Sequence, residues 1–241
     1  MAVIFYLSGT GNSLYAAKSI AQELEQCRLE GITGYLKAPY EVQDEVVGIV
    51  CPVYCMALPP VMEAFLQQVK MVPQYIFLVV TMGAMSGQAL GQGKELLKQR
   101  ELRLSYGAQV ALPDNSIVFP SPQARQEKLL RNVPPEFGLI ARNIKNKYDN
   151  YQHLDRGFLC KYGGTAAGMW VLDKIKQFGK LSCADDKCVG CGICAEVCPA
   201  GNITMAAGKP AFGSECVHCF GCAHWCPQNA ISLGRLKPDQ K

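Results

Sequence analysis

Eight of the thirteen cysteines lie near the C-terminal end of the chain, in two quartets with the same spacing. Each quartet reads C-x2-C-x2-C-x3-C-P. This spacing is typical of two [4Fe-4S] clusters, because three thiolates in one tight loop bind one cluster while the fourth cysteine reaches the other. We therefore expect each fourth cysteine to cross over. The two predicted ligand sets are Cys188, Cys191, Cys194 and Cys226 for one cluster, and Cys198, Cys216, Cys219 and Cys222 for the other.

Two other uses of these cysteines fit the sequence less well. Structural zinc uses paired C-x2-C halves, and it gives no reason for a third cysteine at the same interval or for the proline after each fourth. Disulfides need an oxidising compartment, whereas the chain begins Met-Ala-Val-Ile-Phe-Tyr and shows no charged leader. We therefore expect a cytoplasmic chain whose eight thiols bind iron.

Five cysteines lie outside the quartets. Cys27 and Cys51 are expected to pack as small apolar side chains, the former in the first helix and the latter at the end of a strand. Cys55 lies in the loop of residues 51–60. Cys160 and Cys183 are expected to be spare thiols, because both quartets are complete without them.

Composition sets the remaining bounds. The 241 residues are 49% hydrophobic, so the chain can bury a real core, and its length favours two domains. The longest apolar runs, such as residues 75–82, have the length of a strand and are too short to span a membrane. The net charge of +4 is mild and the basic residues are scattered, which argues against a nucleic-acid partner.

Alternating strand and helix patterns precede the quartets. Apolar runs of strand length occupy residues 3–7, 46–50, 75–81 and 104–112, and a weaker run occupies residues 31–36. Helical patterns occupy residues 14–24, 60–69 and 87–100, and a long segment follows at 121–151. Strands that alternate with helices predict a parallel sheet covered on both faces, with ligands beyond the C-terminal ends of the strands.

The loop after the first strand has the residue types of a phosphate-binding loop. It reads Ser-Gly-Thr-Gly-Asn-Ser over residues 8–13 and leads into a helix. The hydroxyls, the glycines and the amides of the helix start can together cradle a phosphate. An ordinary capped helix start uses the same residue types, so this alternative stays open here. A dinucleotide fingerprint needs glycine where Leu14 stands, so a mononucleotide fits better.

Three loops together resemble those of flavodoxins, which bind flavin mononucleotide (FMN). They are residues 8–13, residues 51–60 with the sequence Cys-Pro-Val-Tyr-Cys-Met-Ala-Leu-Pro-Pro, and residues 81–87 with the sequence Thr-Met-Gly-Ala-Met-Ser-Gly. The segment Pro-Asp-Asn-Ser at 113–116 also looks like the family pattern. Followed by the two quartets, these loops resemble the bacterial and archaeal family of flavodoxin-ferredoxin fusion proteins over nearly the whole chain.

The resemblance implies a fold and its divisions. A flavodoxin-like doubly wound α/β fold, with a parallel sheet of strand order 2-1-3-4-5, is expected over residues 1–155. A linker or docking segment is expected over 156–182, where an amphipathic stretch at 161–180 would dock one domain on the other. A small α+β 2[4Fe-4S] ferredoxin domain is expected over 183–241.

The resemblance also implies residues that bind FMN. Residues 8–13 would hold the phosphate, and the two later loops would line the isoalloxazine ring, where Tyr54 either stacks on the ring or is an ordinary surface aromatic. The second and third loops contain no acidic residue. The expected contacts are Ser8, Gly9, Thr10, Gly11, Asn12, Ser13, Pro52, Val53, Tyr54, Cys55, Met56, Thr81, Met82, Gly83, Ala84 and Gly87.

FMN and two [4Fe-4S] clusters lead to two expected functions. An electron carrier between low-potential one-electron partners is expected, because no nicotinamide-binding unit or acid-base constellation stands out. The alternative is a small FMN-dependent reductase that takes in electrons through the clusters. Redox proteins such as a ferredoxin are the expected partners. Arg142, Lys145 and Lys147 are either their docking patch or a solvated face, and a homodimer stays open.

Overall fold

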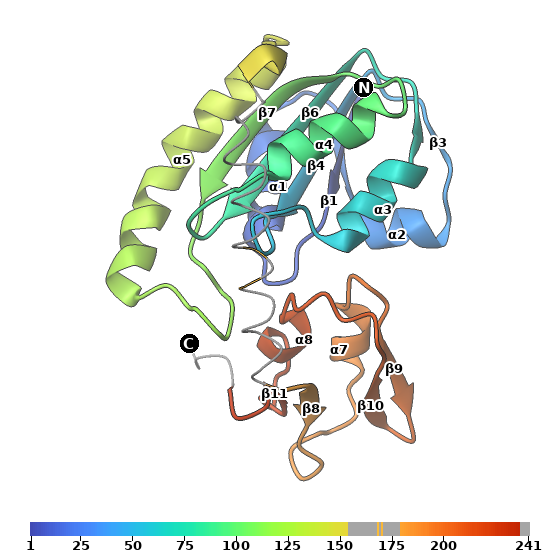
Figure 1. The fold of residues 1–241 in the computed structure, drawn as a ribbon, viewed down its shortest axis with the longest axis vertical. Coiled ribbons are helices and arrows are strands. Elements are labelled where there is room, and N and C mark those ends of the chain that lie inside the picture. Colours follow the sequence, from blue (N-terminus) through green and yellow to red (C-terminus); the bar gives the residue numbers. More distant parts are fainter. Residues whose placement is uncertain (154–167, 169, 171–178, 237–241) are drawn as a thin grey trace.

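The computed structural model describes residues 1–153, 168, 170 and 179–236. Within these residues, five parallel strands form the central sheet of the larger domain (Figure 1). The strands lie in the order β2-β1-β4-β6-β7, and every neighbouring pair is parallel. Counted among themselves, they have the order 2-1-3-4-5 of flavodoxin-like sheets. This part of the predicted fold class is confirmed. The strands are β1 (Ala2–Tyr6), β2 (Cys27–Gly31), β4 (Val46–Pro52), β6 (Tyr75–Met82) and β7 (Leu104–Ala111).

Helices cover both faces of this sheet (Figure 1). On one face, α1 (Asn12–Glu23) and α5 (Gln123–Lys145) pack over Ile4, Val50 and Val79. On the other face, α2 (Ile32–Lys37), α3 (Pro60–Gln68) and α4 (Ala89–Lys98) pack over Val3 and Phe5 and their neighbours. Because successive strand residues point to opposite faces and both faces are buried, the central strands read as continuous apolar runs.

The prediction of a strand over residues 31–36 is wrong. The strand there is β2, which ends at Gly31, and the next residues form α2. Ile32 and Tyr35 lie three positions apart on that helix and are both fully buried, which is helical spacing in a segment too short to show it clearly. The prediction that Cys27 lies in the first helix is therefore also wrong, because Cys27 begins β2. Its side chain is half-buried against the face of the sheet that α1 covers.

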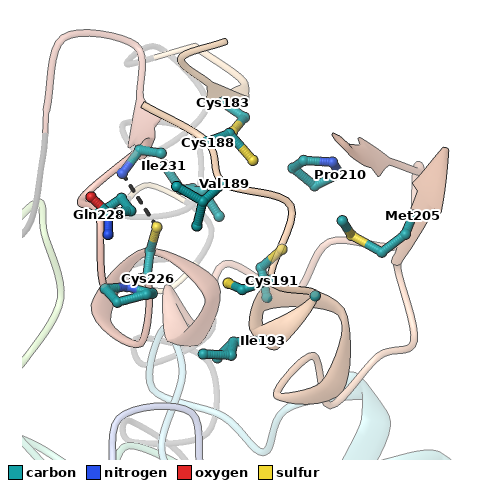
Figure 2. A pocket seen from close by; sticks show the side chains of 14 residues that line it. Cys183, Cys188, Val189, Cys191, Ile193, Met205, Pro210, Cys226, Gln228 and Ile231 are labelled. Carbon is teal, nitrogen blue, oxygen red and sulfur yellow. Dashed lines mark hydrogen bonds between the residues drawn. The ribbon is translucent and has the colours of Figure 1, made fainter. Parts of the chain in front are cut away.

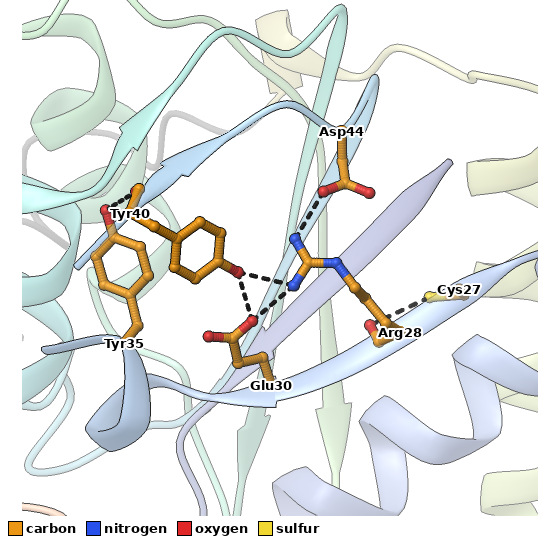
Figure 3. A network of polar contacts seen from close by, with 6 residues as sticks. All are labelled: Cys27, Arg28, Glu30, Tyr35, Tyr40 and Asp44. Carbon is orange, nitrogen blue, oxygen red and sulfur yellow. Dashed lines mark hydrogen bonds and ion pairs between the residues drawn. The ribbon is translucent and has the colours of Figure 1, made fainter. Parts of the chain in front are cut away.

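A polar network explains why β2 lacks an apolar pattern (Figure 3). The Arg28 guanidinium donates to Glu30 and to Asp44, with both distances 2.7 Å, and Tyr40 donates to the same Glu30 oxygen at 2.5 Å. These contacts join the edge strand to the segment after α2. Charged side chains on an edge strand also disfavour pairing with another chain.

Short elements complete the larger domain. β3 (Glu41–Val42) and β5 (Lys70–Met71) form a small parallel pair, and a 3-10 helix, η1, covers Tyr151–His153. The predicted docking stretch at 161–180 lies almost wholly outside the described residues, and so does Cys160. Among the described residues, no helix has both the length and the apolar composition needed to cross a bilayer.

The smaller domain repeats one unit twice. The first unit contains β8 (Leu181–Cys183), α7 (Ile193–Glu196) and β9 (Ile203–Ala206), and the second contains β10 (Lys209–Phe212), α8 (Gly221–His224) and β11 (Ile231–Leu233). Corresponding elements are separated by the same offset as the two quartets. β8 pairs with β11 and β9 with β10, both antiparallel, so each ribbon takes one strand from each unit. The helices α7 and α8 lie on the side that faces the larger domain (Figure 1).

The two units share backbone conformations but not the residues that adopt them. Gly190 and Gly192 have positive φ in the first unit, and the equivalent positions of the second unit are His218 (φ 53°) and Phe220 (φ 57°). A left-handed conformation costs a residue with a side chain on the order of 1 kcal/mol. The second unit therefore keeps two bulky side chains at positions where the fold favours glycine.

Candidate flavin and cluster sites

A cavity of about 500 Å³ lies where the loops leave the C-terminal ends of β1, β4, β6 and β7. This is the edge at which doubly wound sheets bind ligands. The structure brings all three predicted FMN loops to this one cavity. The predicted FMN contacts that line it are Ser8, Gly9, Thr10, Asn12, Ser13, Pro52, Val53, Tyr54, Cys55, Thr81, Met82 and Gly83.

Four of the predicted FMN contacts do not line the cavity. They are Gly11, Met56, Ala84 and Gly87, and all lie in the same loops. Met56 and the end of the third loop instead contact each other, since the Gln88 amide donates to the Met56 carbonyl at 2.9 Å. Met56 and Gln88 therefore fix the second loop against the end of the third.

The first loop is shaped to leave helix amides available. Gly11 precedes α1 with a φ of 104°, which favours glycine, and its amide donates to Ser8 Oγ at 3.2 Å. No side chain in the described structure caps the start of α1. The first amides of a helix have no acceptor within the helix, so an anion can accept hydrogen bonds from them. Ser13 is buried and its hydroxyl bonds to Thr81 Oγ1 at 2.8 Å, which joins this loop to the third.

Sequence reasoning missed a fourth loop at this cavity. Asn115 Nδ2 donates to Thr10 Oγ1 at 3.3 Å and to Asn12 Oδ1 at 3.4 Å, and Asn12 in turn donates to the Pro113 carbonyl at 2.8 Å. Phe119, which is 48% exposed, also lines the cavity. The signal was present, because the 113–116 segment resembled the family pattern, but no role had been assigned to it.

Two acidic residues also line the cavity, although the second and third loops contain none. Asp114 follows β7, and Glu63 lies on α3, where Gln92 donates to its carboxylate at 2.6 Å. Asp114 lies so close to Gly83 that a Cβ added there would be 2.8 Å from a carboxylate oxygen. Negative charge near a flavin disfavours reduced forms, which carry more negative charge.

We expect Asp114→Asn to raise the two-electron midpoint potential of a flavin bound in this cavity by about 30 mV or more. One charge removed at about 4 Å changes the interaction by about 1 to 4 kcal/mol, depending on the local dielectric, and about 1.4 kcal/mol corresponds to 30 mV for two electrons. An anaerobic redox titration followed by flavin absorbance measures the shift. Glu95→Gln, an exposed position on α4 outside the cavity, is the control and should leave the potential unchanged. A lower potential in the Asp114 variant would contradict the assignment.

The first predicted cluster set lies around one small cavity of the smaller domain (Figure 2). Cys188, Cys191 and Cys194 of the first quartet line it together with Cys226 of the second. The sulfur of Cys226 accepts a hydrogen bond from the Ala230 amide at 3.3 Å. Cys183 lies at the same cavity, so a thiol that the sequence placed outside the ligand set is a neighbour of it.

The second predicted set lies elsewhere in the same domain, where Cys216 and Cys219 line the large cavity. The Cys198 thiol helps to raise the pKa of Cys216, Cys219 and Cys222 through its charge, so the four thiols lie near one another. Cys198 Sγ accepts from the Asn202 amide at 3.2 Å, the counterpart of the bond to Cys226. Amide donors to sulfur stabilise thiolates and tune cluster potentials.

The chemistry of these thiols fits iron-sulfur clusters. Burial, with a smaller contribution from neighbouring thiols, raises the pKa of Cys222 to about 12 and that of Cys219 to about 11. Thiols with such pKa values lose their protons at neutral pH only when a cation binds them, as iron does. In the described part of the chain, no three His, Cys, Asp or Glu side chains form a group that could hold a single metal ion.

The remaining thiols and the basic residues differ in their surroundings. Every cysteine in the described part of the chain is free of disulfides; Cys51 is buried, as expected, and Cys55 is half-buried. Burial raises the pKa of both thiols. Lys145 lies 3.7 Å from Glu25 at the C-terminal end of α5, the end remote from the smaller domain (Figure 1). A partner docked at the basic residues Arg142, Lys145 and Lys147 would be far from the quartet cysteines of the smaller domain.

The match to a known family concerns the smaller domain, and the strand order defines the larger one. Residues 172–231 match the family described as a 4Fe-4S dicluster domain. The chain therefore joins a flavodoxin-like α/β domain to an iron-sulfur domain of ferredoxin type. The resemblance to flavodoxin-ferredoxin fusion proteins is confirmed at this level. No curated protein matches the chain.

Several solved structures are similar to the larger domain. The Trp repressor binding protein from Bacillus subtilis has a TM-score of 0.37 and 9% identity, and the match covers 56% of this chain and 96% of that one. A putative flavoprotein from Bacteroides uniformis has a TM-score of 0.36 and 14% identity, and the match covers 52% of this chain and 95% of that one. Two-electron reduced Megasphaera elsdenii flavodoxin has a TM-score of 0.37 and 17% identity, and the match covers 70% of this chain and 99% of that one. At these values the strand order, and not the likeness, carries the fold assignment.

Proposed function

We propose that this protein is a cytoplasmic electron carrier that binds one FMN and two [4Fe-4S] clusters. The observation that carries the proposal is the composition of the larger cavity. The predicted FMN loops form one side of it, and residues 216–220 of the second quartet form another. A flavin held there would adjoin the cluster of Cys198, Cys216, Cys219 and Cys222.

The residues of the larger domain would bind and orient FMN. The 8–13 loop and the amides of α1 would hold the phosphate, and Asn115 would hold Thr10 and Asn12 in place through its amide. Tyr54 lines the cavity, and its pKa is raised first by burial and then by the nearby Cys219 thiol. This side chain of the second flavin loop therefore lies near the second cluster loop. Bound FMN supplies the ability to exchange one or two electrons.

The first unit would face the external partner. Val189, which is 66% exposed, and Cys191, which is also exposed, lie at the small cavity of the first cluster set (Figure 2). A redox protein could approach this cluster closely there. We therefore place the outer cluster at the first set and the flavin-adjacent cluster at the second, with one-electron partners such as a ferredoxin on the outer side.

Purification without oxygen, followed by quantitation of cofactors, tests the proposal. We expect about eight iron and eight sulfide per chain, the content of two [4Fe-4S] clusters, and about one flavin released by acid as FMN. A reductive titration should show both chromophores. Stoichiometric zinc, only about four iron per chain, or release of FAD would each contradict the proposal.

A further inference from the structure

The phosphate loop and the second cluster loop touch along their backbones. A Cβ added at Gly9 would lie 3.0 Å from both the Cβ and the carbonyl oxygen of Cys219. A Cβ added at Gly221 would lie 2.9 Å from the Gly9 carbonyl oxygen. Glycine on both sides thus permits an approach that side chains would prevent.

Two side chains after the second cluster loop bond to the flavin-site loops. The Trp225 indole Nε1 donates to the Gly9 carbonyl at 3.0 Å, and the His224 ring nitrogen Nε2 lies 2.6 Å from the Asn115 carbonyl oxygen. Trp225 is 52% exposed, so its ring is not simply core packing. Gly9 and Asn115 belong to the first and fourth loops of the cavity, and the second unit therefore holds both.

The first unit makes no equivalent contact among the described residues. Val197 stands at the position of Trp225 and has no side-chain donor, and Cys191 stands at the position of Cys219 but lines the small outer cavity. The side-chain hydrogen bond of this unit to the larger domain joins the Pro199 carbonyl to Thr33 Oγ1 at 3.4 Å, on α2 and away from the cavity. The repeat is symmetrical in backbone but not in what it touches.

We propose that the second cysteine unit is a positioning element of the phosphate loop, so that assembly of its cluster and binding of FMN strengthen each other. The inference rests on the proposed function. When iron is bound, the loop of Cys216, Cys219 and Cys222 is fixed, and through Trp225 it fixes Gly9. Because coupling between two binding equilibria is reciprocal, FMN must protect this cluster by the same factor. The first cluster takes three ligands from the first unit and only one, Cys226, from this unit, so its coupling to FMN should be weaker.

A matched pair of variants tests the asymmetry. Cys191→Ser and Cys219→Ser make the same change at equivalent positions of the two units. FMN affinity is measured anaerobically by quenching of flavin fluorescence, and iron per chain is measured in the same samples. We expect Cys219→Ser to weaken FMN binding about tenfold, and Cys191→Ser to change it by less than about twofold, while each loses iron.

Trp225→Phe tests the positioning contact without removing a cluster ligand. The ring stays and the indole donor is lost, so we expect iron content to be unchanged and FMN binding to weaken about three- to tenfold, the worth of one hydrogen bond. Saturating FMN should slow removal of iron from the second cluster by a chelator in the original protein, and this protection should shrink in the Trp225 variant. A purely structural role for the ring would not move the protection.

The outcomes separate this proposal from the proposed function. Equal losses of FMN affinity in the two serine variants would overturn the coupling. It would also be overturned if Cys219→Ser caused no loss of FMN affinity, or if Trp225→Phe caused none. These results would leave the assignment of the cofactors unaffected. If the original protein bound no FMN, the proposed function itself would fail, and the coupling with it.

Discussion

Replacing Thr10 with glutamate should reduce FMN affinity by more than a hundredfold while leaving iron content unchanged. Thr10 lines the large cavity, and its hydroxyl is held by Asn115 at 3.3 Å. A carboxylate there would meet the phosphate dianion at the start of α1. Repulsion between charges about 4 Å apart costs about 1 to 4 kcal/mol per pair, depending on the local dielectric, and the larger side chain adds a steric cost. About 2.8 kcal/mol corresponds to a hundredfold loss.

Thr10→Ser is the matched control for this prediction. It keeps the hydroxyl that accepts from Asn115 and removes only a methyl group, so FMN affinity should stay within about threefold of the original. Both variants are measured by flavin fluorescence in protein purified without oxygen, with iron determined in parallel. Retention of stoichiometric FMN by the glutamate variant would show that the phosphate does not bind at residues 8–13.

The parts of this structure that could be predicted from the sequence depend on local patterns. The β/α alternation gives four of the five central strands to within about two residues, because strands buried on both faces are long apolar runs. The edge strand β2 was not predicted, because its residues form a polar network with Asp44 and Tyr40 and do not alternate between apolar and polar types. Tertiary contacts decided that segment, and local pattern did not.

The candidate site divides in the same way. The cysteine spacing and the 8–13 loop are local and can be read directly. The contacts of Asn115 with Thr10 and of Trp225 with Gly9 join residues far apart in the chain, so only the folded structure shows them. Glu63 reaches the cavity from a helix whose sequence looks like ordinary packing.

One signal of the domain contact was nevertheless present in the sequence. Aligning the two quartets places His218 and Phe220 opposite Gly190 and Gly192. Glycine is what the shared backbone favours, since all four residues have positive φ. Two bulky residues at such positions imply a local gain that offsets the strain. The structure provides a reason, because both side chains line the cavity shared with the flavin loops.

Removing iron with a chelator under anaerobic, reducing conditions should unfold the smaller domain and leave the larger one folded. The core of the smaller domain has few members, and two of them, Cys194 and Cys222, are themselves predicted ligands. A domain of about 60 residues is marginal even with an ordinary core, so bound clusters must supply much of its folding free energy. The larger domain has two extensive cores that contain none of the eight quartet cysteines.

Hydrogen exchange measured by mass spectrometry distinguishes the two domains in this experiment. Amides of β9 and β10 should lose protection by several orders of magnitude after chelation, while those of β6, whose side chains are almost all buried, should keep theirs. Chelator already saturated with iron is the control and should change neither. Persistent protection at β9 and β10 in iron-free protein would mean that the polypeptide, and not its clusters, holds this domain together. The cysteines would then lie in a preformed scaffold, and loss of the second cluster would leave Gly9 and the phosphate loop in place.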